Sequence, residues 1–586
     1  MFNKYYQDEL AFLRELGREF SQAHPEAAPF LSERGADPDV ERMLEGFAFL
    51  TGRVRQKLDD EIPEFTHALM EMIWPHYLRP LPAMTIVQFE PLPQAAKESR
   101  VVARGVDLDS QPIDGTACRF RTAYDVAMHP VIQEGAELRL ESPSHLRLKF
   151  RMQEGVQPKK AAIPSLRLYF HGEPTVTRAL YLCLTHQLKR VLIKATEGGP
   201  SGKVIALPAD VVKPVGFSPE QALLPTPPTT FDGYRLLLEY FTFPSKFLFL
   251  DVTGLQKLAE LGEARAFDIT FELKRLPEQM PALGTAGVLL NCTPAVNLFK
   301  HDADPIRLDP ARSEYRIRPS GASPEHYEIY AATKVTGLIK GTAKPREYRP
   351  FFGFSHSLSP TGDDVAFHRT RVDRSVATEG TETFISFVGR SGEPAAVLDV
   401  ETATFELLCT NRQLPTKLRM GDVNVQTSTS PVFARFKNIT KVAPAVPPPL
   451  GGEIYWRLLS HLTLNYLSLA RVESLRGVLS LYNFRAMVDR QAEQGHRLLL
   501  DGIKRVSATP TTRLVQGRPV RGVALELDLE EDNFAGEGDM YLFSTLLNEF
   551  FTLYVTLNSF SQLTVKGLKY GEVYAWPPRI GGRTTL

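Results

Sequence analysis

The stretch LRLKF at residues 146–150 alternates apolar and basic side chains, and the stretch LRLYF at residues 166–170 largely repeats the alternation. A period of two places one set of side chains in a core and the other in water, which is typical of half-buried antiparallel strands. Residues 85–89, 137–140 and 268–274 follow the same pattern. Gly, Pro and Asp cluster at short intervals between these stretches, so we predict a β-sandwich-like domain over residues 84–300.

Strand patterns continue beyond residue 300. They recur at residues 327–330, 383–387 and 405–408, which indicates a second β-rich domain over residues 301–445. The stretch APAVPPPLGG at residues 443–452 then carries tandem prolines, which favour a stiff, extended linker. We place a domain boundary in this stretch.

The C-terminal part of the chain mixes both periods. Residues 456–464 and 472–488 indicate helices, whereas residues 497–500 and 523–529 indicate strands. We therefore predict an α+β domain over residues 446–586.

An apolar stretch from Met540 to Phe560 is about as long as a membrane span. It contains Asn548, Glu549 and Asn558, and a glutamate in the middle of a span costs roughly 2–4 kcal/mol in lipid. We predict a buried core or interface segment and no insertion into a membrane.

The N-terminal segment, residues 1–83, follows the helical period. Asp37 and Pro38 read as a helix N-cap followed by proline at the first helical position. Two apolar faces result, one in each of two consecutive helices. From the periodicity alone, a hairpin that packs on its own domain is the favoured interpretation, because short apolar stripes usually serve the local core. A helix donated to a bundle between chains is the alternative. The whole chain is thus predicted to be a multi-domain α+β protein.

Composition limits the classes of partner. Single cores rarely grow beyond about 250–300 residues, so a chain of 586 residues is expected to form three or four domains. Lys and Arg together number 68, as do Asp and Glu, which gives a net charge of zero. Nucleic-acid binding needs a basic excess for phosphate neutralisation, so we exclude a nucleic-acid partner. Zero net charge favours association with other proteins.

Four cysteines are spread far apart, and none has the spacing of a metal site. They are Cys118, Cys183, Cys292 and Cys409. The first residues lack the apolar segment of a signal peptide, so free thiols in the cytoplasm are expected.

No motif for nucleotide binding or hydrolysis is complete in the sequence. The stretch GGPSGKV at residues 198–204 has glycines one residue too close for a phosphate loop, and Val204 cannot hold a metal. His301, Asp302 and Asp304 lie close enough in sequence to suggest a divalent-metal site of a carbohydrate-active enzyme. Such clusters are common without function, so we predict no catalytic residue, no metal and no cofactor. The enzyme, and a secreted carbohydrate-binding sandwich protein, remain the alternatives.

Longer stretches carry a family resemblance. The run YYQDELAFLRELGREF at residues 5–20 resembles the opening of the TssF family, also called ImpG or VasA. Residues 37–50, 72–80 and 291–299 continue the resemblance, and two further stretches lie at residues 475–479 and 542–557. The similarity thus spans nearly the whole chain.

The resemblance implies a structural subunit of the type VI secretion baseplate without catalysis. Two TssF copies are expected to wrap one TssG, and the resulting wedge to bind TssK, TssE, the VgrG hub and the contractile sheath at the cytoplasmic face of the inner membrane. It makes two sets of residues candidates for partner binding. The interchain helical bundle would use Tyr6, Leu10, Leu13, Leu16, Phe20, Val40, Leu44, Phe47 and Leu50. A contact between neighbouring wedges would use Phe550, Phe551 and Tyr554, although a core role is favoured for this segment.

Overall fold

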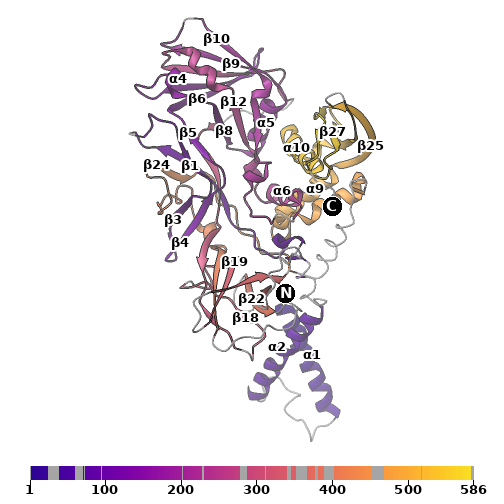
Figure 1. Cartoon of the computed structure of the whole chain (residues 1–586). Coiled ribbons are helices and arrows are strands. Elements are labelled where there is room, and N and C mark those ends of the chain that lie inside the picture. The colour runs from indigo at the N-terminus through magenta and orange to yellow at the C-terminus, as the bar shows by residue number, and fades with distance from the viewer. Residues whose placement is uncertain are drawn as a thin grey trace.

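The computed structural model has several sheets stacked along one side of the molecule, a C-terminal unit beside them and a pair of helices at the lower end (Figure 1). The described residues are 2–23, 38–59, 67, 70, 71, 73–93, 95–200, 202–227, 230–277, 287–309, 312–321, 323–339, 345–351, 366–375, 380–388, 401–450, 468–515 and 518–582. Within these ranges, no helix combines the length and the apolar character needed to cross a membrane. The arrangement confirms the predicted multi-domain α+β class.

The N-terminal helices pack against each other as a pair. They are α1 (Phe2–Ala23) and α2 (Pro38–Asp59). The second helix begins at the predicted proline, whose missing N–H is not needed in the first turn. Figure 1 shows this pair projecting from the rest of the molecule.

The first sheet joins segments that are far apart in the chain. Its order is β24 (Ala434–Asn438), β1 (Met84–Pro91), β15 (Cys292–Val296), β4 (Thr116–Thr122) and β3 (Asp107–Ile113). Beside it β2 (Arg100–Val102) pairs with β5 (Val126–Met128). The interior strand β1 is covered on both faces, because Ile86 packs into one core cluster and Val87 and Phe89 into another.

Two further sheets contain the strands with the clearest alternation. One has the order β10 (Val204–Pro208), β9 (Leu188–Glu197), β13 (Ala266–Leu273), β7 (His145–Met152) and β6 (Val131–Arg139). The other has the order β11 (Val212–Val215), β12 (Phe249–Thr253), β8 (Ser165–His171) and β14 (Gly287–Leu289). The predicted strands at residues 146–150 and 166–170 lie in β7 and β8, with Leu146, Leu148 and Phe150 buried. The helices of this region are α4 (Pro158–Ala161), α5 (Pro174–Thr185) and α6 (Asp232–Thr242).

An eight-stranded sheet follows in the chain between β15 and β24. Its order is β16 (Phe299–Asp302), β23 (Glu401–Thr410), β19 (Glu328–Ile339), β20 (Arg346–Pro350), β21 (Ala366–Arg374), β22 (Thr381–Val388) and β18 (Tyr315–Arg316), while β17 (Ile306–Arg307) pairs with β23. All pairs are antiparallel except β20 with β21. The chain leaves the first sheet after β15 and returns to it in β24, so the eight-stranded sheet is reached through two crossings.

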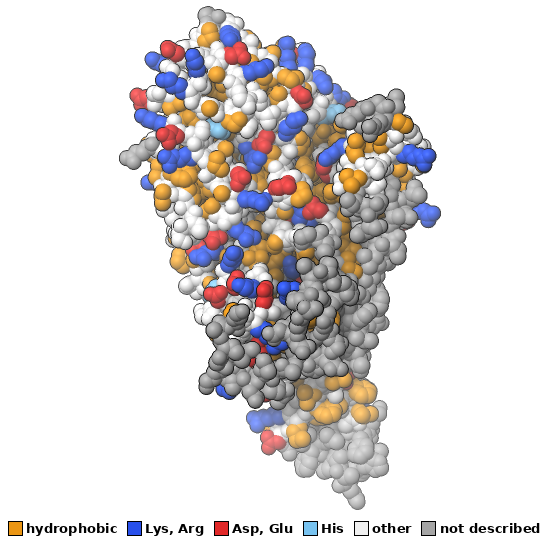
Figure 2. Space-filling view, in the orientation of Figure 1, with side chains coloured by type: hydrophobic (Ala, Val, Ile, Leu, Met, Phe, Trp, Pro, Cys, Tyr) orange, Lys and Arg blue, Asp and Glu red, His pale blue; other side chains and the backbone are white. Residues whose placement is uncertain are grey.

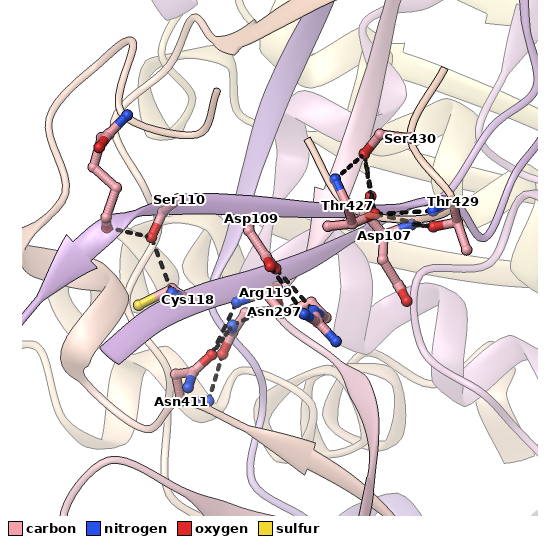
Figure 3. A network of polar contacts seen from close by, with 11 residues as sticks. Asp107, Asp109, Ser110, Cys118, Arg119, Asn297, Asn411, Thr427, Thr429 and Ser430 are labelled. Atoms are coloured by element: carbon pink, nitrogen blue, oxygen red, sulfur yellow. Dashed lines mark hydrogen bonds and ion pairs between the residues drawn. The ribbon is translucent and has the colours of Figure 1, made fainter. Parts of the chain in front are cut away.

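Both crossings are clamped by a reciprocal amide pair (Figure 3). The Asn297 side chain donates to the Asn411 Oδ1 at 2.8 Å, and the Asn411 backbone N–H donates to the Asn297 Oδ1 at 2.7 Å. Both side chains are fully buried, and they also bond the backbone of Arg119. Arg119 in turn makes a bidentate ion pair with Asp109 at 2.8 and 2.9 Å. These bonds hold the two crossing segments together against β4.

The C-terminal unit is a mixed sheet with helices. It contains α8 (Val472–Leu481), α9 (Arg490–Asp501), β25 (Ile503–Val515), β26 (Arg518–Leu529), α10 (Glu537–Leu553), β27 (Ser559–Gly567), β28 (Val573–Ala575) and β29 (Arg579–Ile580). The strands β26 and β27 are parallel, and α10 forms the crossover between them. The apolar stretch after Met540 is therefore a buried helix, as the core interpretation predicted.

Short 3-10 helices connect these elements. They are η2 (Pro75–Tyr77), η3 (Ala209–Val211), η4 (Pro219–Gln221), η5 (Pro244–Phe247), η6 (Leu255–Leu261), η9 (Leu414–Lys417), η10 (Ser468–Ala470), η11 (Phe484–Met487) and η12 (Glu531–Asn533).

One local prediction is wrong, and one lies outside the described residues. Residues 497–500 were expected in a strand but lie in α9, which begins after Asp489 because its carboxylate accepts from the Gln491 backbone N–H at 2.9 Å. The first part of the predicted linker is anchored, because the backbone groups of Ala443 and Val446 pair with those of Met84 and Leu81. The helix expected at residues 456–464 falls outside the described part of the chain. The domain boundaries at residues 83, 300 and 445 stay predictions.

An aromatic cluster joins the C-terminal unit to the rest. Tyr234 of α6 stacks on Tyr482 with ring centroids 4.9 Å apart and an interplanar angle of 5°. The Trp74 ring packs edge-on against the Tyr234 ring, with centroids 5.6 Å apart, and the Tyr554 hydroxyl lies 2.8 Å from the Tyr234 hydroxyl. His76 packs within this cluster, with its ring centroid 6.4 Å from that of Tyr482.

A buried charge cluster, formed by Glu239, Arg235, Lys246 and Asp232, lies on the same helix and just after it. One oxygen of the Glu239 carboxylate accepts from the backbone N–H groups of Leu223 and Leu224 at 2.7 and 3.0 Å. The other accepts from Arg235 at 2.6 Å and from Lys246. Burial lowers the pKa of Lys246 to about 8. Because a buried charge is tolerated only when it is paired and hydrogen-bonded, this cluster fixes the loop, α6 and η5 together.

The Glu239→Gln variant is expected to lose about 3–5 kcal/mol of unfolding free energy, because it leaves the buried Lys246 ammonium without its counter-charge and removes one of the two carboxylates that bind Arg235. The measurement is urea unfolding followed by intrinsic fluorescence. Glu260→Gln is the matched control, since its ion pair with Lys203 at 3.0 Å is solvent-exposed and worth under about 1 kcal/mol. Equal effects of the two substitutions would contradict the role of the cluster.

Acid is expected to destabilise the fold through buried histidines. Burial lowers the pKa of His76 to about 3 and those of His368 and His496 to about 4. The unfolded chain, with histidine pKa values near 6.5, binds more protons, so stability is retained above about pH 6.5 and falls toward about pH 4 by up to about 1.4 kcal/mol per pH unit for each histidine. Urea unfolding at about pH 7 and about pH 5 measures this loss. His76→Phe should reduce this loss, because two of the three buried histidines remain, and an unchanged pH dependence would count against His76.

Candidate interaction surface

A row of large apolar side chains on α2 is exposed to solvent. The exposed fractions are 77% for Met43, 57% for Phe47, 62% for Leu50 and 61% for Val54. Their spacing of four, three and four residues places them along one helix face, in the manner of the apolar positions of a coiled coil. We call these four residues the α2 stripe. Apolar side chains gather on the helical pair at the lower end of the molecule in Figure 2.

A different face of α2 packs against α1. Ala48 and Gly52 are buried, and Leu44 and Thr51 are half-buried. Alanine and glycine, one helical turn apart, allow the two backbones to approach closely. The second helix therefore has two faces: one completes the local hairpin, and the other, the α2 stripe, has no cover among the described residues.

The first helix adds to the exposed apolar surface. Phe12 and Leu16, four residues apart, are 57% and 50% exposed. Tyr6, Leu10 and Leu13 are half-buried in the pair.

The predicted bundle residues are thus divided between the two faces. Leu16, Phe47 and Leu50 are exposed, whereas Tyr6, Leu10, Leu13 and Leu44 are half-buried. The side chains of Phe20 and Val40 lie outside the described part. The predicted set missed Phe12, Met43 and Val54, although the helical period places Met43 and Val54 in line with Phe47 and Leu50. Their partner-binding role stays a prediction.

The rim of the α2 stripe is charged. Asp39, Arg42, Glu45 and Arg53 are exposed on the same helix, with Arg42 and Asp39 3.4 Å apart. Burying one large apolar side chain contributes about 1.5–3 kcal/mol, so covering the stripe is a substantial driving force for association. Apolar residues bordered by mixed charges are typical of a surface that receives another amphipathic helix.

The second set of candidate residues lies in the core of this chain. Phe550 and Phe551 of α10 are buried, and Phe550 packs against Tyr554 at 5.2 Å between ring centroids. Tyr554 is half-buried and contacts Phe231 at 4.4 Å. This placement favours the core role, and a contact between subunits at these residues stays a prediction.

The side chains of the sequence cluster at His301 lie apart in the structure. In β16 neighbouring side chains point to opposite faces, so His301 and Asp302 diverge. The His301 ring lies 2.9 Å from the Ser320 carbonyl oxygen, whereas Asp302 and Asp304 are exposed. Among the described residues, no three of His, Cys, Asp and Glu are grouped as metal ligands.

The thiols are also placed for packing. Cys118, Cys183, Cys292 and Cys409 are free and buried. Burial raises the pKa of Cys118, Cys183 and Cys409 to about 12, and it raises that of Cys292 as well. A nucleophilic thiol needs a lowered pKa and access to solvent, so these four side chains have neither property.

Comparison with known proteins points to one family. The family described as "Type VI secretion system, TssF" matches residues 1–583. Type VI secretion system component TssF1 of Pseudomonas aeruginosa is 32% identical over 627 aligned residues, which cover 100% of this chain and 99% of the relative.

Two solved structures are similar in fold. One, described as the type VI secretion system TssK-TssF-TssG baseplate subcomplex, contains a chain with 30% identity and a TM-score of 0.75, with coverage of 93% of this chain and 99% of that chain. The other, described as the baseplate complex from the type VI secretion system, contains a chain with 26% identity and a TM-score of 0.67, and the match covers 100% of both chains.

Phe47→Asp and Leu50→Asp are expected to leave the free chain folded and to abolish binding of its helical partner, because they place charge on the exposed α2 stripe. Circular dichroism measures the fold, and co-purification measures binding. Ala48→Asp is the control on the packed face, and it should lower the melting temperature. If Phe47→Asp unfolds the isolated chain instead, the stripe belongs to the local core.

Proposed function

The chain belongs to the TssF family of type VI secretion baseplate proteins, and from this premise we propose that it is a structural subunit of the baseplate wedge. In this proposal two copies of the chain wrap one TssG-type subunit. The α2 stripe, with Phe12 and Leu16, supplies this chain's part of a helical bundle between the three chains. The observation that carries the proposal is the exposed stripe in a chain that matches the family along its length.

Exposed apolar surface of this kind is unfavourable in water. Monomeric soluble proteins rarely expose large contiguous apolar patches, and such patches mark interaction sites. The stripe lies on a helix whose other face is already packed, so local rearrangement of the hairpin would cover the stripe only by exposing Ala48 and Gly52. A partner helix covers it without that exchange.

Membership of the family also suggests further partners for the wedge. We propose that the wedge binds TssK, which links it to the inner-membrane complex, and also TssE, the VgrG hub and the sheath. The chain would work at the cytoplasmic face of the inner membrane, without inserting into it. Its task would be to hold these subunits in place while the sheath assembles and contracts.

We propose that the chain is not an enzyme. The family is a structural baseplate component. The divergence of His301 and Asp302 removes the one cluster on which a carbohydrate-active alternative depended. The buried, high-pKa thiols offer no nucleophile for covalent catalysis.

The native mass of the chain tests the proposal directly. Purified alone and co-expressed with a TssG-type partner, the chain should form a stable complex in which two copies accompany one partner. Mass photometry or light scattering measures the stoichiometry. A lone monomer that ignores the partner would overturn the proposal, and a one-to-one complex would overturn the predicted ratio.

A further inference from the structure

An arginine-lined pocket lies between the first sheet and helix α6. Its volume is about 470 Å³. The floor comes from β4 and β15, with Arg121 and Val296, and the opposite wall comes from the loop after η4 and from Arg235. Arg104 stands at the rim, with its guanidinium donating to the Glu220 carbonyl oxygen. We call this space the arginine pocket.

Of the arginines that line the arginine pocket, Arg235 is paired with carboxylates and Arg121 is not. Asp232, the acidic residue among its lining residues, makes a bidentate pair with Arg235 at 2.6 and 2.7 Å, and Arg235 also binds Glu239. No carboxylate of the lining is left for Arg121.

Arg121 is a half-buried cation without a direct counter-ion. No hydrogen bond or ion pair joins its guanidinium to another described residue, and the Asp107 carboxylate on the neighbouring strand attracts it without bonding it directly. Burial lowers the pKa of Arg121. On the same strand, the hydrogen bond that Arg119 donates to Asp109 raises the pKa of Arg119. Arg119 and Arg121 lie on the same face of β4, but only Arg119 is hydrogen-bonded to a carboxylate.

The wall opposite Arg121 is apolar. It contains Ala222, Leu223, Leu224 and Pro225. The backbone N–H groups of Leu223 and Leu224 donate to Glu239, so they are not available to a ligand. Phosphate sites usually offer free backbone N–H groups, and this wall offers none at those two residues. A ligand that carries a carboxylate next to an apolar group fits this pocket, because the carboxylate can pair with the Arg121 guanidinium while the apolar group packs against the wall.

We propose that the arginine pocket binds the carboxylate of an acidic residue in an acidic–apolar segment of a partner protein, with Arg121 as the direct contact. The neighbouring apolar side chain of that segment packs against Leu224 and Pro225. The inference rests on the proposed function, because the partner is a subunit of the same assembly. It adds a second docking site, on the body of the chain and separate from the α2 stripe.

The test compares Arg121→Gln with Arg435→Gln in the full chain assembled with its TssG-type and TssK-type partners. Arg435 is exposed on β24 of the same sheet and makes no ion pair with another described residue, so it is a matched control. Biolayer interferometry measures the affinity for each purified partner. Arg121→Gln should weaken the binding of one partner by about tenfold or more. This difference in affinity between the variant and the original chain should shrink as the salt concentration is raised, because salt screens the ion pair. Arg435→Gln should bind like the original chain.

Photo-crosslinking identifies the occupant. Ala222→p-benzoylphenylalanine in the same complex should capture a partner peptide that contains Asp or Glu beside an apolar residue, and Arg121→Gln should reduce its yield. A peptide without an acidic residue, or unchanged affinity of Arg121→Gln, would overturn the inference. A third outcome would also overturn the inference: inorganic phosphate stabilises the original chain but not Arg121→Gln, and the substitution leaves partner binding unchanged. That result would mark a site for small anions. If the original chain fails to bind any partner, the proposed function itself fails.

Discussion

The buried carboxylate of Glu239 is the constraint on which the packing of the body depends. A carboxylate out of water is very unfavourable unless its oxygens are saturated, and here two backbone N–H groups, a guanidinium and an ammonium saturate them. These donors come from the loop before α6, from α6 itself and from η5. Three segments therefore have one mutually consistent position.

The same helix organises the apolar side of the body. Tyr234 lies one residue before Arg235 in α6, and it stacks on Tyr482 while its hydroxyl lies next to that of Tyr554. The charge cluster thus fixes a helix, and the helix presents an aromatic ring to the C-terminal unit. Together with the Asn297–Asn411 clamp at the two crossings, this gives a body whose modules are held by buried, directional contacts.

The helical pair differs from the body, because it leaves large apolar side chains exposed. Its small residues Ala48 and Gly52 complete a close local packing, whereas Met43, Phe47, Leu50 and Val54 face water. A body held by saturated polar contacts, joined to a helix with an uncovered apolar stripe, is suited to a subunit that keeps its own shape and gains its last contacts from partners. The arginine pocket extends this principle to a charge, since Arg121 lacks the directly bonded carboxylate that its neighbour Arg119 has.

The sequence by itself determined the features that depend on local chain geometry. Alternation in the stretches at residues 146–150 and 166–170 predicted strands because side chains on a strand alternate between faces, and helical spacing predicted α1, α2 and their apolar residues. It failed at residues 497–500, where a short apolar run fits either period. Only the tertiary structure decided which segments meet. Strand β1 pairs with β24 about 350 positions later, and Glu239 binds Lys246 and the Leu223 backbone N–H. One face of α2 is covered, whereas the α2 stripe is exposed. The physical reason is that periodicity arises from the backbone of each element, whereas pairing, burial and the satisfaction of charges depend on groups that distant segments bring together.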